Sequence, residues 1–286
     1  MTAVATTVVM LGTGTPYPDP NRSGPATAVV VDETPYLIDF GPGVVRRVMA
    51  AYRNGVSAFG RCAINIKTVF LTHLHSDHTL GYPDLIFTPW IMGRAEPLAA
   101  YGPPGLKSMT DNIMQAWQID IDARAKRLPN PAAYRVDVHE IAPGIIYRDR
   151  NVTVTAFPVN HPEMTDSFGF RFETQNRTIV LSGDTTPTPT LIDRAHGCDV
   201  LIHEAYSLAS CEKITPAWRE FRRTHHTSSR ELAAIAEQVK PSLLILYHRS
   251  NAGGEEGDLR DEAELIKEIR QYYKGNVVIG RDLDVF

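Results

Sequence analysis

Short apolar segments alternate with amphipathic segments along this chain, and a turn or a polar residue follows each of them. Runs of β-branched residues predict strands, and apolar residues spaced three or four apart predict helices. The helix at 227–240 has the clearest signature, because Ser228 and Glu231 are placed as a capping box. The pattern predicts strands or β-rich blocks at 6–11, 26–31, 36–39, 67–72, 150–160, 168–184, 242–248 and 276–280, helices at 44–55, 227–240 and 260–273, and a mainly helical region at 80–130.

The order of these elements is β-rich and then helical in each half of the 286-residue chain. This order predicts an α/β fold with two mixed sheets between helices. No low-complexity linker and no short-period repeat interrupts the sequence. We therefore expect one domain over residues 1–286.

Four predicted buried strands each end in a residue that can bind a metal ion. These residues are His73, His161, Asp184 and His248. In open α/β sheets, functional groups gather outside the carboxyl ends of the strands, so we expect the four side chains to share one rim. Imidazole and carboxylate ligands suit zinc and its neighbours, and the set lacks the thiolates of closed structural zinc sites.

The segment VFLTHLHSDHTLGYPDL concentrates this chemistry, with His73, His75, Asp77 and His78 inside six residues. A lone histidine at a strand end is more often a hydrogen-bonded structural residue, and Asp184 could serve only as a turn former or helix N-cap. An H-x-H-x-D-H cluster is rare by chance, and it strengthens the case for the other strand-end residues. The cluster therefore favours a metal site.

Composition excludes several other classes of protein. Apolar residues make up 43% of the chain and charged residues 22%, as in ordinary globular enzymes. The net charge of −4 argues against tight binding of nucleic acid or anionic membranes through bulk electrostatics. Three cysteines without paired spacing argue against a disulfide framework, and the sequence shows no signal peptide or membrane-spanning run. We therefore expect a cytoplasmic protein.

The motif THLHSDH at 72–78, with His161, Asp184 and His248 following in order, resembles the metallo-β-lactamase superfamily of hydrolases. Within that superfamily the chain is most similar to the ribonuclease Z and arylsulfatase-like branch. The supporting stretches are VVMLGTGTPYPDPNRSGPA, LIDFGPG, SGDT, LIHEAYS and HHTSSRELAAIA. The resemblance covers nearly the whole chain, and it implies a four-layer αββα sandwich with the site at one edge of the two sheets.

The resemblance implies that seven residues hold two divalent metal ions, with zinc (Zn²⁺) expected first and Mn²⁺ or Fe²⁺ as alternatives. Such a pair of ions activates the water that attacks the substrate. Asp184 would bridge the two ions. Asp39, in LIDFGPG, would orient a ligand histidine, unless it only bonds the Gly-Pro-Gly turn that follows. The other implied ligands are His73, His75 and His161 for the first ion, and Asp77, His78 and His248 for the second.

A proton-transfer pair that does not bind metal is also implied. Glu204 follows a predicted strand in LIHEAYS, and His226 precedes the capped helix. A carboxylate on one ring nitrogen fixes the tautomer, so that the other nitrogen can deliver a proton to the leaving group. His225 is the rival candidate, and a purely structural role for the pair stays open. With Asp77, the residues Glu204 and His226 form the predicted catalytic group.

Two departures from the ribonuclease Z pattern shape the functional prediction. Only residues 162–183 lie between the third and fourth ligand motifs, and they predict a plain hairpin instead of the long arm that grips tRNA in that family. The segment LYHRSN also lacks the Ser-Arg-Tyr ending that usually follows the last histidine. Both departures argue against tRNA 3′ processing.

The sequence therefore predicts a hydrolase of a small ester-type substrate, such as a sulfate ester, phosphodiester or lactone. No nucleic-acid or membrane partner is expected, and family analogy favours a homodimer. Two alternatives stay open: a ribonuclease Z-like RNA 3′-processing endonuclease, and a non-catalytic metal-binding or sensing protein. The basic, aromatic stretch at 218–226 would hold an anionic or aromatic substrate, or it is only a solvated helix face.

Overall fold

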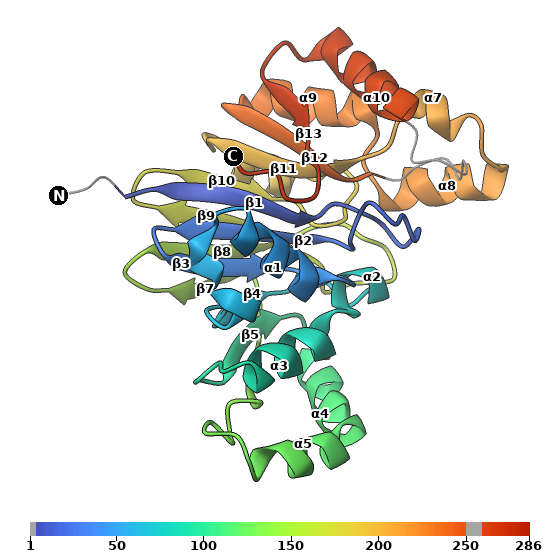
Figure 1. Cartoon of the computed structure of the whole chain (residues 1–286). Coiled ribbons are helices and arrows are strands. Elements are labelled where there is room, and N and C mark those ends of the chain that lie inside the picture. Colours follow the sequence, from blue (N-terminus) through green and yellow to red (C-terminus); the bar gives the residue numbers. More distant parts are fainter. Residues whose placement is uncertain (1–3, 250–258) are drawn as a thin grey trace. The chain divides into compact units, whose positions relative to one another are not determined.

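A computed structural model describes residues 4–249 and 259–286. The chain forms two compact units, each built on its own sheet (Figure 1). Unit 1 comprises residues 1–16, 20–141 and 281–286, and unit 2 comprises residues 17–19 and 142–280. The expectation of a single domain stays a prediction. The last two residues of LYHRSN, at 250–251, lie outside the described residues.

The sheet of unit 1 is mixed, with its strands in the order β1-β2-β3-β4-β5-β6. The strands β1 to β3 pair antiparallel, and β3 to β6 pair parallel. The sequence ATAVVV of β2 is buried on both faces, as its continuous apolar run requires. The bounds are β1 (Thr6–Gly12), β2 (Ala26–Val31), β3 (Thr34–Ile38), β4 (Thr68–Phe70), β5 (Leu98–Gly102) and β6 (Val136–Glu140).

Amphipathic helices pack on this sheet. In α1, the residues Val44, Val48 and Ala51 form a buried stripe that joins the apolar core of the strands. The short α2 carries part of the histidine cluster directly after β4. The helices of unit 1 are α1 (Val44–Arg53), α2 (Ser76–Thr79), α3 (Tyr82–Ile91), α4 (Leu106–Ala116) and α5 (Gln118–Ala125), with the 3-10 turns η1 (Ser57–Phe59) and η2 (Arg61–Ala63).

Residues 281–286 belong to unit 1 and run along the outer edge of β1. The amide of Val8 donates to the Phe286 carbonyl at 3.0 Å, and the amide of Phe286 donates back at 2.9 Å. The carboxylate of Asp282 accepts hydrogen bonds from the backbone amide and the hydroxyl of Thr13, both at 2.9 Å. An edge strand exposes unpaired backbone groups, and this segment satisfies those of β1.

The sheet of unit 2 is also mixed, with its strands in the order β13-β12-β11-β10-β9-β8-β7. The strands β7 to β10 pair antiparallel, and β10 to β13 pair parallel. The parallel part therefore brings the carboxyl ends of β10, β11 and β12 to one edge. The bounds are β7 (Gly144–Arg148), β8 (Val152–Pro158), β9 (Phe168–Thr174), β10 (Thr178–Leu181), β11 (Val200–Ala205), β12 (Leu243–Arg249) and β13 (Val277–Ile279).

The helices α9 and α10 lie side by side and cover this sheet (Figure 1). The predicted capping box is confirmed, because Ser228 and Glu231 bond each other's backbone amides at the start of α9. Among the described residues, no helix has both the length and the apolar character needed to cross a membrane. The helices of unit 2 are α6 (Pro189–Ala195), α7 (Leu208–Cys211), α8 (Pro216–His225), α9 (Ser229–Val239) and α10 (Leu259–Tyr272).

Most of the predicted elements are confirmed, including two mixed sheets with helices. The predicted helices correspond to α1, α9 and α10, and the helical region contains α3, α4 and α5. The sequence analysis missed β6, β7 and the short β5 inside the helical region. The sequence VDVHE of β6 has no fully buried position, so its hydrophobic pattern carries little signal.

Candidate functional site

The histidine cluster of unit 1 follows β4 directly. His73, Asp77 and His78 are buried, and His75 is half-buried. The ring atoms His73 Nε2 and His75 Nδ1 lie 3.0 Å apart, and the ring centroids of His73 and His78 lie 4.1 Å apart. The structure therefore gathers the four predicted residues of this segment into one buried group of imidazoles and a carboxylate.

Asp39 anchors this cluster from the end of β3. Its carboxylate accepts hydrogen bonds from the Thr72 amide at 2.8 Å, the Thr72 hydroxyl at 3.0 Å and His78 Nδ1 at 2.8 Å. Because a carboxylate only accepts, His78 carries its proton on Nδ1 and presents the lone pair of Nε2. This geometry agrees with the first of the two interpretations of Asp39, an orienting residue for a histidine. Its backbone holds a φ of 57°, a strained value for a residue other than glycine.

The predicted residues of unit 2 also lie at strand ends. His161 follows β8, Asp184 follows β10, and His248 lies near the end of β12. All three side chains are buried. His248 Nε2 lies 3.3 Å from the Asp184 carboxylate, and His161 Nδ1 lies 3.1 Å from the carbonyl of His225. The expected convergence of strand ends holds within this unit.

His248 occupies a β-bulge. Glu204 of β11 pairs with Tyr247 and Ala205 pairs with Arg249, so His248 is the extra residue of β12. Its φ of 41° lies in the left-handed region, which an L-residue adopts only at a cost. At this bulge the His248 ring lies beside the carboxylate of Asp184, which follows β10.

Glu204 and His226 form the predicted pair. Both are buried, and His226 Nδ1 lies 2.8 and 3.0 Å from the two carboxylate oxygens of Glu204. The Thr185 amide donates to the same carboxylate at 2.6 Å. Burial raises the pKa of Glu204 above its usual value, and the neighbouring His226 offsets part of that rise. The two donors favour the ionised carboxylate, so we assign the pair as carboxylate and imidazolium.

The pKa of His226 agrees with that assignment. Burial disfavours the charged imidazolium, but the Glu204 carboxylate outweighs burial and raises the pKa of His226 to about 9. His225, the rival candidate, instead donates from Nδ1 to the Phe221 carbonyl at 2.9 Å, and its ring stacks on that of Phe221 at 4.1 Å. In this structure His226 contacts Glu204, whereas His225 Nδ1 bonds within α8 and the His225 ring lies 5.7 Å from that of His161.

Sequence analysis did not identify every residue at this edge. His203 is fully buried beside Glu204, and burial lowers the pKa of His203 to about 4, so its ring is neutral. Its Nδ1 lies 2.7 Å from the carbonyl of Glu204. The Thr185 amide is a second missed partner. The sequence pattern identified neither residue. His203 lies inside β11, and Thr185 contacts Glu204 through its backbone amide.

The donor set suits a divalent metal ion. In unit 2, the Asp184 carboxylate and the His248 ring are both buried, and His248 Nε2 lies 3.3 Å from the carboxylate. In unit 1, three imidazoles and a carboxylate lie on one short segment. Neutral imidazole and carboxylate are the ligands that Zn²⁺, Mn²⁺ and Fe²⁺ share, and Asp39 already fixes one imidazole in its ligand tautomer.

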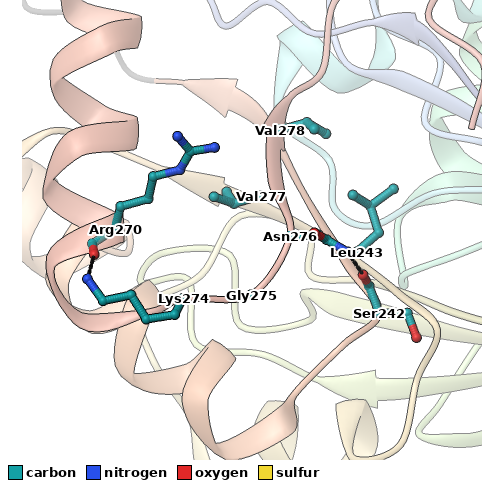
Figure 2. Close-up of a pocket in the computed structure, with 8 residues that line it drawn as sticks. All are labelled: Ser242, Leu243, Arg270, Lys274, Gly275, Asn276, Val277 and Val278. Atoms are coloured by element: carbon teal, nitrogen blue, oxygen red, sulfur yellow. Dashed lines mark hydrogen bonds between the residues drawn. The ribbon is translucent and has the colours of Figure 1, made fainter.

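A pocket of about 740 Å³ lies elsewhere in unit 2 (Figure 2). It opens where β12 and β13 begin, with Leu243 and Val277 in its wall. The Lys274 ammonium donates to the Arg270 carbonyl across its rim. His248 lies at the other end of β12, so this pocket is separate from the strand ends that carry the candidate residues. Its lining residues are Ser242, Leu243, Arg270, Lys274, Gly275, Asn276, Val277 and Val278.

The sequence matches a family model described as the beta-lactamase superfamily domain, over residues 34–249. The chain belongs to the metallo-β-lactamase superfamily. It is therefore a hydrolase of a metal-dependent fold family, and the fold class predicted from the sequence is confirmed.

Similar proteins and solved structures indicate to which branch of the superfamily this chain belongs. Ribonuclease Z of Mycobacterium bovis (strain BCG / Pasteur 1173P2) is 33% identical over 282 residues, covering 96% of this chain and 96% of that relative. The crystal structure of the short form of human tRNase Z is 24% identical, with a TM-score of 0.71 and 98% of both chains covered. The crystal structure of the metallo-β-lactamase fold protein YhfI from Bacillus subtilis is 19% identical in sequence, with a TM-score of 0.71 and 99% of both chains covered. The resemblance to the ribonuclease Z branch is confirmed.

These relatives contradict the prediction of a small ester-type substrate without a nucleic-acid partner. The absence of a long arm was a misleading criterion, because the M. bovis relative aligns over 96% of its own length and leaves no room for a long extra segment. Net charge was misleading as well. It sums over the whole surface, and a total of −4 is compatible with a local basic region such as α8.

Proposed function

We propose that this protein is a ribonuclease Z-type endonuclease that removes 3′ extensions from precursor tRNA. The observation that carries the proposal is the 33% identity to a ribonuclease Z over 96% of both chains. The buried imidazoles and carboxylates at the strand ends support it, since they suit metal-assisted hydrolysis of a phosphodiester.

The proposal keeps the ligand set implied by the resemblance. Two divalent ions, zinc in the first instance, are proposed as its cofactors. When bound, they supply Lewis acidity and an activated water for attack on phosphorus. The proposed ligands are His73, His75, Asp77 and His78 of unit 1, and His161, Asp184 and His248 of unit 2.

The proposed role of the protein's own groups concerns the leaving oxygen. Hydrolysis breaks a P–O bond, and the departing alkoxide must take up a proton. The Glu204 carboxylate raises the pKa of His226 and holds its Nδ1, so we assign its Nε2 as the nitrogen that delivers the proton. The Thr185 amide fixes the carboxylate in turn. We assign Glu204 as the positioning residue and His226 as the general acid.

The cellular location and the oligomeric state are also proposals. The three cysteines, Cys62, Cys198 and Cys211, are all free thiols, which suits the cytoplasmic location expected from the sequence. A homodimer is proposed by family analogy, and light scattering of the purified protein tests it.

Replacement of Asp39 by asparagine is expected to weaken metal binding about 10- to 100-fold, because partners that orient a ligand histidine contribute about that much. The amide cannot accept from His78 and both Thr72 donors as the carboxylate does. Competition of the purified variant with a chelator for Zn²⁺ measures the change. Asp111→Asn, at an exposed aspartate of α4, is the matched control. If Asp39→Asn and the wild type bound Zn²⁺ with equal affinity, Asp39 would not be a residue that orients His78 for metal binding.

The metal-loaded protein is expected to cleave a precursor tRNA at the 3′ side of the acceptor stem. Gel analysis of a transcript with a short 3′ trailer detects the cut, and mature tRNA without a trailer is the matched control. Aryl sulfate, lactone and simple phosphodiester substrates measure the competing activity. Rapid turnover of one of these esters, with the precursor left intact at physiological salt, would refute the proposed function.

A further inference from the structure

An aromatic stripe lies along α8. Trp218, Phe221 and His225 are spaced by three and then four residues, so they share one face of the helix. An aromatic stripe at this spacing normally packs into a core. Here Trp218 is 59% exposed and Phe221 is 38% exposed, whereas His225 at the inner end is buried. The outer part of the stripe is therefore open to solvent.

The rings form a continuous track toward the strand ends of unit 2. Trp218 meets Phe221 edge-on at 5.5 Å, and Phe221 stacks on His225 at 4.1 Å with an angle of 20° between the planes. Phe221 also lies 5.8 Å from the proposed general acid, His226. The ring of His225 then lies 5.7 Å from that of His161. Each step is the distance of an ordinary aromatic contact.

The helix around this stripe is locally basic. Residues 212–226 contain one lysine and three arginines against two glutamates, in a chain whose net charge is −4. Two of the arginines reach those glutamates, Arg219 to Glu212 and Arg223 to Glu220, both at the exposed surface. Arg222 is buried beside the inner end of the stripe. Aromatic rings on a segment with a net charge of +2 suit a polyanion that carries planar rings.

We propose that Trp218 and Phe221 form a stacking platform for unpaired nucleobases of single-stranded RNA, next to the scissile phosphodiester. The proposal rests on the proposed function and names the part of the precursor that unit 2 would hold. Bases in a duplex stack on one another, and only unpaired bases expose a ring face to protein. The proposed occupant is therefore the unpaired 3′ trailer, and not the base-paired stem.

The test compares precursors that differ only in pairing of the trailer. Trp218→Ala and Phe221→Ala are each expected to raise KM about 5- to 100-fold for a precursor with an unpaired trailer, as loss of a base–aromatic stack does. The kcat should change much less. Trp218→Phe keeps a ring and should recover most of the affinity. Tyr272→Ala, at an aromatic residue that is 50% exposed on α10, is the matched control with no expected change.

Annealing a complementary oligonucleotide to the trailer should abolish the difference between Trp218→Ala and wild type. A second readout is Trp fluorescence, because titration with single-stranded oligouridylate should quench wild type more than Trp218→Phe. An unchanged KM in both alanine variants would overturn the proposed stacking platform. If the wild type still cleaves the precursor, the proposed function would stand in that case. Conversion of a dimer into a monomer by Trp218→Ala, without a KM effect specific to unpaired trailers, would assign this surface to a second copy of the chain and overturn the proposal.

Discussion

His75→Ala and Asp184→Ala are expected to lower metal occupancy and to reduce RNA cleavage by a factor on the order of a thousand or more. Bound metal ions supply several kcal/mol of stabilisation to the transition state, and each variant removes a proposed ligand. Mass spectrometry of metal content and single-turnover cleavage of precursor tRNA measure the two effects on the same sample.

Matched controls come from exposed residues of the same types. His139→Ala on β6 and Asp193→Ala on α6 remove an imidazole and a carboxylate that are open to solvent and are not candidate residues, and both variants should retain metal and activity. If His75→Ala or Asp184→Ala kept full metal content and full activity, the ligand assignment would be wrong. Full wild-type activity in excess chelator would reject metal-assisted hydrolysis altogether.

His226→Ala is expected to reduce cleavage by roughly a hundredfold or more while leaving metal content intact, as loss of general acid catalysis does. The loss should shrink for phosphodiesters with a good leaving group, such as a nitrophenolate, since these need no proton to depart. The ratio of rate constants for poor and good leaving groups, measured in wild type and variant, isolates the proton transfer.

Two companion variants sharpen this test. Glu204→Gln should give a smaller loss with the same dependence on leaving group, because Glu204 acts through His226. His225→Ala should not change that dependence, since the His225 ring bonds its own helix. An equal loss for good and poor leaving groups, or a loss of metal from His226→Ala, would reassign His226 to metal binding or to folding.

The positions of the candidate residues could be predicted because strands and their ends leave a strong pattern. Each apolar run was long enough to identify, and the residue after it was a metal-binding type, as for His161 and Asp184. The capping box of α9 was predictable for the same reason, since Ser228 and Glu231 act over one turn. Local patterns of this kind need no knowledge of distant contacts.

The remaining features depend on contacts that a sequence pattern does not contain. The choice between His225 and His226 depends on how α8 ends, with His225 as its last residue and His226 extended beyond it. The orienting role of Asp39 depends on a fold that brings it to His78, 39 positions later. The substrate class was mispredicted from the missing arm, the missing Ser-Arg-Tyr ending and the net charge, because none of the three describes the local surface that meets the substrate.

The segment that covers the outer edge of β1 has a consequence for synthesis on the ribosome. Residues 281–286 complete unit 1, yet they are translated after all of unit 2. A nascent chain can therefore fold most of unit 1 early, but β1 keeps an open edge and Thr13 lacks the Asp282 carboxylate until translation reaches them. An open edge invites pairing with another chain. Chaperone protection during elongation thus matters most for β1, whose edge partner is translated after the whole of unit 2.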